Sequence, residues 1–310
     1  MPEWIAERGI GEVRFAAVED GEIVEARIAL DGSLPAESII AARLKQVAKP
    51  TIAIAGDVEF LLPRGAPGVN EGAVLNIEVT REAIPGGEPW KRPLAKVTDE
   101  ALRNAPALGA RPAARDELGA AGWDDLVEQA RSGRVQFAGG ELRISPTPAM
   151  TLIDVDGYLA PDALAALGAA EAAKAIRRLD IGGSIGIDLP TAGSKAARQA
   201  AAAEIDRHLP QLFERTAVNG FGFVQIVRPR ARASLVELAQ DRAAFEARAL
   251  LRRAAFETAG AKRLVAHPAV IAVLQARAGW LEALARQVGG AIGLRAEAAL
   301  PISGGYAEHA

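Results

Sequence analysis

Two short apolar runs, each ending in a carboxylate, mark the hydrophobic pattern of this chain. Residues 150–157 (Met-Thr-Leu-Ile-Asp-Val-Asp-Gly) carry Asp154, and residues 182–190 carry Asp188. The segment 161–178 between them is rich in alanine and is predicted to be a helix. A crossover helix joins strands that run parallel. We therefore expect Asp154 and Asp188 to lie side by side at one edge of a sheet.

Short alternating segments between residues 38 and 98 predict a second kind of structure. Turn residues such as Gly56-Asp57 separate them. The expected strands cover residues 39–47, 51–54, 58–62, 74–80 and 91–97. Five short strands in about 60 residues suit a small barrel such as an OB-fold.

The rest of the chain alternates between hairpins and helices. Asp20-Gly21 between two apolar segments is a strong hairpin signal. Further expected elements are a linker at 105–114, a helix at 123–131, a hairpin at 134–145, long helices at 194–214 and 235–259, a small α/β unit at 263–299 and a frayed tail from 302. The expected fold class is α/β with an inserted β-barrel.

The amino-acid composition excludes several kinds of functional site. The 310 residues include no cysteine, which excludes disulfides, thiolate zinc sites and cysteine nucleophiles. The formal net charge is -3, so a globally basic nucleic-acid binder is not indicated. The sequence has no run of 18 apolar residues, and we expect a cytoplasmic protein without membrane contact. Two adjacent carboxylates repel each other unless a cation lies between them, and their hard oxygen ligands suit Mg²⁺ or Mn²⁺.

Four segments, in one order, resemble the bacterial ribonuclease E/G family. They are residues 139–156 with Gly-Gly, Pro-Thr and Ile-Asp-Val-Asp, residues 178–188 with Gly-Gly and Ile-Asp, residues 221–230 with Phe-Gly and Arg-Pro-Arg, and residues 263–270. The match is specific over residues 130 to 300 and looser upstream of them. The chain is similar to a minimal ribonuclease G-like member, without the zinc-link cysteines and the full 5′ sensor.

The resemblance implies a fold of four parts. Residues 1–37 and 99–145 would form a reduced, split ribonuclease H-like domain, interrupted by the OB-fold RNA-binding barrel at 38–98. A DNase I-like α/β catalytic domain would follow at 146–234. Residues 235–310 would form a helix and a small C-terminal α/β domain.

The function that the resemblance implies is a metal-dependent endoribonuclease acting on single-stranded RNA. The two aspartates that hold Mg²⁺ in the family correspond to Asp154 and Asp188. Asp156 stands where the family has an asparagine that orients the attacking water or the scissile phosphate, so we expect all three to be catalytic. Mn²⁺ is a second candidate metal, no zinc is expected, and a homo-oligomer would form without a zinc link.

Several residues are candidate RNA contacts. Phe60 matches a family position on the barrel surface and would stack a base, although a place in the core is an equal alternative. The full set is Phe60, Trp90, Lys91, Arg92, Arg228, Arg230 and Arg232. Aromatic residues beside basic ones suit single-strand binding. For the arginines, solvated surface charge is the competing interpretation.

Two other functions stay open. The chain would be an RNA-binding protein with a degenerate nuclease site if Asp156 impairs cleavage, because a carboxylate cannot donate a hydrogen bond unless it is protonated. A phosphodiesterase for a different substrate would use the same metal site.

Overall fold

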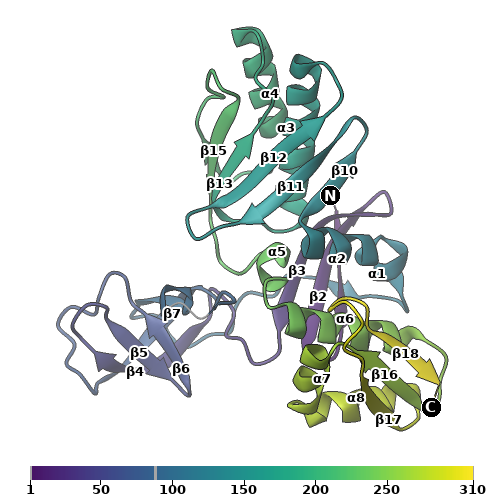
Figure 1. Cartoon of the computed structure of the whole chain (residues 1–310). Helices are drawn as coiled ribbons and strands as arrows, with labels where there is room; N and C mark the ends of the chain where they lie inside the picture. Colours follow the sequence, from purple (N-terminus) through teal and green to yellow (C-terminus); the bar gives the residue numbers. More distant parts are fainter. Residues whose placement is uncertain (1, 87–88, 310) are drawn as a thin grey trace.

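The structure is a computed structural model that describes residues 2–86 and 89–309. Figure 1 shows four connected parts. A small central sheet joins a barrel at the lower left, a larger sheet with two helices at the top, and a C-terminal unit at the lower right. The mixed α/β architecture with a closed barrel was predicted from the sequence and is confirmed.

The central sheet has the strand order β3-β2-β1-β9. Its strands are β1 (Glu3–Arg8), β2 (Glu12–Glu19), β3 (Glu22–Leu30) and β9 (Arg111–Pro112), and α1 (Glu117–Ala120) and α2 (Trp123–Ser132) follow. The expected β2–β3 hairpin is present, with Asp20 and Gly21 both at positive φ in its turn. The sequence analysis missed β1, and the expected linker supplies β9, which pairs with β1.

The barrel is closed in the order β4-β5-β6-β8-β7. Its elements are β4 (Ile39–Gln46), β5 (Ile52–Ala55), β6 (Val58–Leu61), β7 (Val74–Arg81), the 3₁₀ turn η1 (Pro89–Lys91) and β8 (Leu94–Val97). Alternate residues point inward, so that Leu44, Phe60 and Ile77 form a core separate from the rest of the molecule.

The largest sheet carries the two apolar runs. Its order is β10-β11-β12-β13-β15-β14, formed by β10 (Arg134–Phe137), β11 (Gly140–Pro146), β12 (Thr151–Gly157), β13 (Gly183–Asp188), β14 (Glu214–Arg215) and β15 (Phe223–Arg228). The sheet continues across the expected boundary between residues 145 and 146, because β10 pairs with β11 and β11 pairs with β12. A single hydrophobic core joins this sheet to the central one.

Two helices, α3 (Pro161–Arg178) and α4 (Lys195–His208), pack on each other and cover one face of this sheet. Close approach explains the small residues of α3: a Cβ atom on Gly168 would lie 2.3 Å from Cγ1 of Val155 in β12. The second helix ends at His208, short of the expected Glu214, and Pro210 follows.

The C-terminal part differs from the sequence prediction in two places. The expected helix 235–259 is broken into α5 (Leu235–Leu238) and α6 (Arg242–Phe256), each with its own N-cap, Ser234 and Asp241. The expected frayed tail is a strand, β18 (Tyr306–His309), which pairs with β16. The remaining elements are β16 (Lys262–Ala266), α7 (Pro268–Gln275), α8 (Ala278–Val288) and β17 (Ile292–Ala296).

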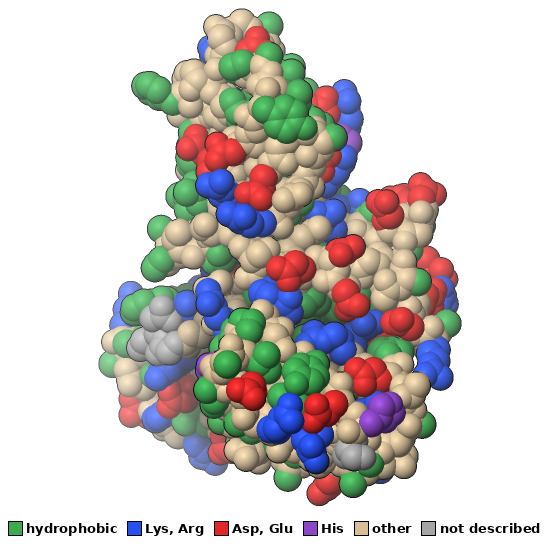
Figure 2. All heavy atoms as spheres, turned by 45° about the vertical axis from the view of Figure 1, so that its right-hand side comes forward, with side chains coloured by type: hydrophobic (Ala, Val, Ile, Leu, Met, Phe, Trp, Pro, Cys, Tyr) green, Lys and Arg blue, Asp and Glu red, His purple; other side chains and the backbone are tan. Residues whose placement is uncertain are grey.

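The surface mixes both signs of charge. Figure 2 shows acidic and basic side chains interspersed over the middle and lower parts of the molecule. In the part of the chain that the structure describes, no helix is long and apolar enough to cross a membrane.

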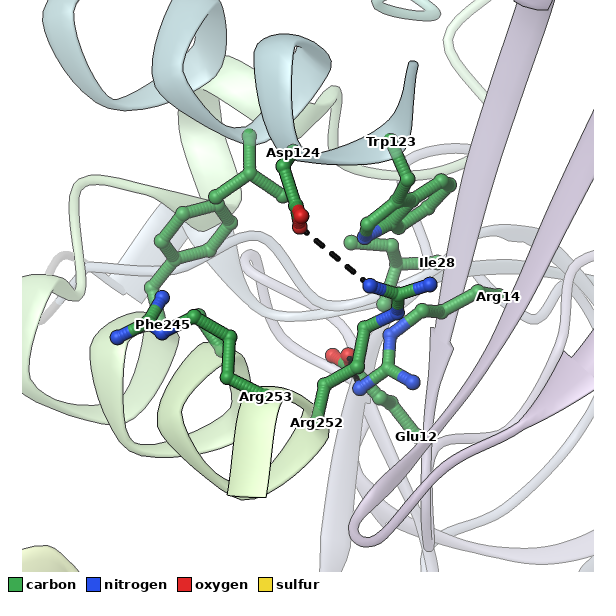
Figure 3. Close-up of a pocket in the computed structure, with 10 residues that line it drawn as sticks. Glu12, Arg14, Ile28, Trp123, Asp124, Phe245, Arg252 and Arg253 are labelled. Atoms are coloured by element: carbon green, nitrogen blue, oxygen red, sulfur yellow. Dashed lines mark hydrogen bonds and ion pairs between the residues drawn. The ribbon is translucent and has the colours of Figure 1, made fainter. Parts of the chain in front are cut away.

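Buried ion pairs attach α6 to the central sheet. Arg248 Nε donates to Glu12 Oε2 at 2.9 Å, and Arg252 Nε donates to Glu7 Oε1 at the same distance. A small pocket lies between α6, α2 and the central sheet. Figure 3 shows Arg252 reaching Asp124 of α2, with Arg14 and Glu12 on the sheet side of this pocket. Apart from Asp124, which is 70% exposed, these charged groups are shielded from water, so each depends on its partner.

Candidate functional site

The two aspartates of the apolar runs meet as expected. Asp154 of β12 lies opposite Asp188 of β13 in the parallel ladder. Paired positions on strands about 4.8 Å apart send their side chains to the same face of the sheet. Ile153 and Ile187 point to the other face and are fully buried in the core that α3 shares. The carboxylates therefore lie on the face opposite α3.

Asp156 lies on the same face, two positions beyond Asp154. Its side chain is 60% exposed and forms an ion pair with Arg143 of β11, with 3.7 Å between Oδ2 and Nη1. Arg143 pairs with Asp154 across the strands and donates to Glu141 Oε1 at 3.2 Å. An arginine thus lies beside the acidic cluster, between it and Glu141.

The electrostatics of this cluster are unfavourable without a cation. The pKa of Asp154 is raised by partial burial and by the charges of Asp156 and Asp188. Arg143 and the backbone N–H of Val155 oppose this shift without cancelling it. The cluster therefore carries more negative charge than the arginine balances.

A divalent cation fits the Asp154–Asp188 pair better than it fits a three-carboxylate cage. Among the described residues, no group of three or more His, Cys, Asp or Glu side chains is arranged to hold a metal ion. Mg²⁺ is usually bound through one or two carboxylates and keeps several waters. The two facing aspartates match that ligand set, and Asp156 is directed to Arg143.

The expectation that Phe60 stacks a base is wrong. Its side chain has no exposed surface and belongs to the barrel core. Strand β6 alternates, so Glu59 faces outward, where it pairs with Lys45 and Arg92, and Phe60 faces inward. An aromatic ring in this position stabilises the barrel and is not accessible to RNA.

Two of the three arginines expected to contact phosphate have hydrogen-bond or ion-pair partners within the protein. Arg228 Nη1 donates to the carbonyl of Ile181 at 2.8 Å, and Arg232 pairs with Asp180 at 3.2 Å. Both guanidinium groups join segments that are distant in the sequence. Because both side chains are partly buried and have partners in the protein, free surface charge does not describe them, and phosphate contact stays a prediction.

Arg230, Trp90 and Lys91 come together in a cavity between the barrel and the large sheet. The cavity has a volume of about 560 Å³. Its lining comes from the end of the barrel, the β11–β12 turn and the α5–α6 junction, and includes Arg81, Trp90, Lys91, Thr147, Arg230 and Glu237. Arg92, the remaining predicted contact, pairs with Glu59 on the barrel surface.

The cavity has an excess of positive charge close to an aromatic ring. Trp90 is 62% exposed, and Arg230 forms an ion pair with Glu237. The pKa of Arg81 is lowered by burial and, to a smaller extent, by the charge of Arg230. In the described part of the chain, the Nε atoms of both arginines are buried without a hydrogen-bond partner.

A short apolar floor connects this cavity with the carboxylates. Thr147 is in the turn that leads into β12, and Asp154 is the fourth residue of that strand, about 10 Å from its start at 3.3 Å per residue. A Cβ atom on Gly186 would lie 2.6 Å from Phe223 and 3.0 Å from the sulfur of Met150, so these side chains lie over the sheet between the two regions.

Sequence reasoning missed Arg81 and Arg143. A hairpin register for β11 and β12 would have placed Arg143 opposite Asp154. Arg81 had no such signal, because Thr147, Arg230 and Glu237, which share the cavity with it, come from segments more than sixty residues away.

Comparison with protein-family models gave no match, and no curated protein matches the chain. The functional assignment therefore depends on the geometry of the site and on the segments that resemble ribonuclease E/G.

Proposed function

We propose that this protein is a metal-dependent endoribonuclease that cleaves single-stranded RNA. The observation that carries the proposal is the pairing of Asp154 with Asp188 on the open face of the sheet, where partial burial and the charges of Asp156 and Asp188 raise the pKa of Asp154. Such a pair becomes favourable once a cation is bound. The segments that resemble ribonuclease E/G support the choice of RNA.

Different residues of the chain would have different roles in cleavage. Asp154 and Asp188 would hold Mg²⁺, or Mn²⁺, through carboxylate oxygens. When bound, the metal lowers the pKa of a coordinated water and stabilises charge on the phosphate. Arg143 offers its guanidinium group to a phosphate oxygen, and Asp156 holds Arg143 beside the pair.

The RNA path is supported by the cavity at the end of the barrel. Trp90 offers an exposed ring for a base, while Arg81, Lys91 and Arg230 supply positive charge to the backbone. The strand would leave this cavity over Met150 and Phe223 and reach Asp154. Binding should therefore weaken as salt increases.

Cleavage of a fluorescent single-stranded RNA, with Mg²⁺, Mn²⁺ or EDTA, tests the proposal. We expect metal-dependent cuts by the wild type and none by Asp154→Asn or Asp188→Asn. Asp31→Asn is the matched control, because Asp31 is exposed in the loop after β3 and belongs to no acidic cluster described above. Equal cleavage by all four proteins would reject the assigned site.

The alternative of an RNA-binding protein with an inefficient site is favoured by one observation. Arg143 already contacts both Glu141 and Asp156, which reduces its attraction for phosphate. Asp156→Asn separates the two functions. If Asp156 assists by holding Arg143, cleavage falls by about fivefold or less, the value of an exposed ion pair. A clear gain in cleavage would show that Asp156 impairs the nuclease site.

A further inference from the structure

Two aromatic side chains are far more exposed than aromatic residues usually are. Tyr158 is 85% exposed and Phe221 is 83% exposed, the highest values among the exposed large hydrophobic side chains of residues 2–86 and 89–309. Figure 2 shows hydrophobic side chains standing out from the upper part of the molecule, which the large sheet forms. Such rings usually lie in a core or an interface, because they carry large apolar surfaces.

Both rings lie at the edge where the acidic cluster is. Tyr158 directly follows β12, and its N–H donates to the carbonyl of Gly139 at 3.1 Å. Phe221 is two residues before Phe223, which pairs with Asp188. Because β12 and β13 are parallel, their carboxyl ends meet at this edge, and antiparallel β15 starts there. The two aromatics therefore flank the Asp154–Asp188 pair.

The backbone holds Phe221 in its exposed position. Oδ1 of Asn219 accepts hydrogen bonds from the N–H groups of Phe221 at 2.9 Å and Phe223 at 3.0 Å. Gly222 has a φ of +91°, and a Cβ atom there would lie 2.1 Å from the carbonyl oxygen of Leu189. The turn is thus fixed against the segment that follows Asp188, while the ring itself points into solvent.

We propose that Tyr158 and Phe221 are stacking positions for unpaired bases of the RNA next to the cleaved phosphate. This inference rests on the proposed function. A protein partner would need a contiguous contact area of about 800 Å² on each side. Here β13, which ends at the charged Asp188, lies between the strands that carry the two rings, which suits a polymer that alternates flat bases with phosphates.

The acidic surroundings add a condition to this binding. Asp156 and Asp188 repel phosphate in the absence of a cation, so stacking at this edge requires a divalent metal. The cavity at Trp90 also contains two carboxyl groups, Glu237 and Asp241, but Arg81, Lys91 and Arg230 outnumber them and Arg230 pairs with Glu237, so RNA binding there would need no metal. The two regions therefore differ in their metal dependence.

Binding of an RNA that contains 2-aminopurine tests the proposal, because stacking quenches this fluorophore. With Mg²⁺, Tyr158→Ala and Phe221→Ala are each expected to weaken binding about 5- to 150-fold and to reduce the quenching. Tyr158→Phe and Phe221→Trp should retain both. The matched control is Tyr306→Ala, which removes the chain's only other tyrosine from β18 of the C-terminal sheet.

The outcomes separate this inference from the proposed function. Loss of binding in the alanine variants and retention in the aromatic variants supports stacking. If the wild type binds and cleaves RNA and the alanine variants bind it equally well, the stacking positions are overturned. The proposed nuclease function then still stands. Absence of RNA binding by the wild type, with or without Mg²⁺, overturns both.

Discussion

Asp154 faces two further carboxylates, Asp156 and Asp188, across a distance set by the sheet. The arrangement that suits a cation is unfavourable without one, since burial and both charges raise the pKa of Asp154. Active sites commonly reduce stability in this way. Stability and metal binding should therefore respond in opposite directions when this residue is changed.

The first prediction is that Asp154→Asn stabilises the metal-free protein at pH 7. Removing one of two like charges that lie directly opposite each other on neighbouring strands should increase the free energy of unfolding by about 0.2–1 kcal/mol. Thermal unfolding in EDTA should show a higher Tm for the variant, and Mg²⁺ should raise the Tm of the wild type only. A variant that is less stable in EDTA, or that Mg²⁺ stabilises as much as the wild type, contradicts the assigned pair.

Single residues were predictable where one local pattern decides their position. The strand–helix–strand unit was enough to place Asp154 beside Asp188. The expected base stacking by Phe60 was wrong, because the position of a residue in a strand does not show which face of the strand points into the barrel. The partners of Arg228 and Arg232 within the protein, Ile181 and Asp180, were not predictable because they come from another segment of the chain.

At the scale of elements, the turn before β15 controls both Phe221 and the backbone after Asp188. The second prediction is that Gly222→Ala destabilises the protein by about 1–3 kcal/mol, because Gly222 has positive φ and a Cβ atom would overlap the Leu189 carbonyl. Urea unfolding measures the loss, and cleavage should fall with it.

Gly220→Ala is the control for this substitution. Gly220 is two residues away in the same turn, and a Cβ atom there meets nothing within 4 Å. It should be neutral or slightly stabilising. Equal effects of the two substitutions would show that the turn is not held against Leu189.

Element boundaries were predictable only where the terminal signals were applied. Ser234 and Glu237 form a capping box and Asp241 caps α6, and these signals in the sequence mark two helices where one was predicted. The strand β18 had no comparable local signal. Its pairing with β16 joins residues more than forty positions apart, which periodicity does not reveal.

At the scale of the whole molecule, buried charges join parts that are distant in the sequence. Glu12 is 4% exposed and lies between Arg14 and Arg248. The third prediction is that Glu12→Gln destabilises the protein by about 3–5 kcal/mol, because it leaves a buried arginine without its counter-charge. Glu100→Gln, at an exposed ion pair with Arg103, should change stability by about 0.5 kcal/mol or less. Chemical denaturation compares the two, and similar effects would show that the network is accessible to water.

The junction between the barrel and the central sheet contains a carboxyl group, Glu82, whose negative charge is unfavourable in the folded protein. The N–H of Glu82 donates to the Ala231 carbonyl at 2.8 Å, and its Oε1 accepts from the N–H of Ala36 at 3.3 Å. Burial raises the pKa of Glu82 above its ordinary value, despite the charge of Arg232. The folded protein therefore binds this proton more tightly than the unfolded chain does.

The sign of the pH dependence follows from this shift. Because the folded-state pKa is raised, the contribution of Glu82 to stability is lost as pH increases through it, and the ionised group is unfavourable at pH 7. The fourth prediction is that Glu82→Gln stabilises the protein at pH 7 by more than the roughly 0.5 kcal/mol typical of surface changes. The difference should shrink as pH falls towards 4, where the wild-type carboxyl is protonated. Urea unfolding of both proteins from pH 7 to pH 4 measures it, and a difference independent of pH would mean that Glu82 is not buried at the junction.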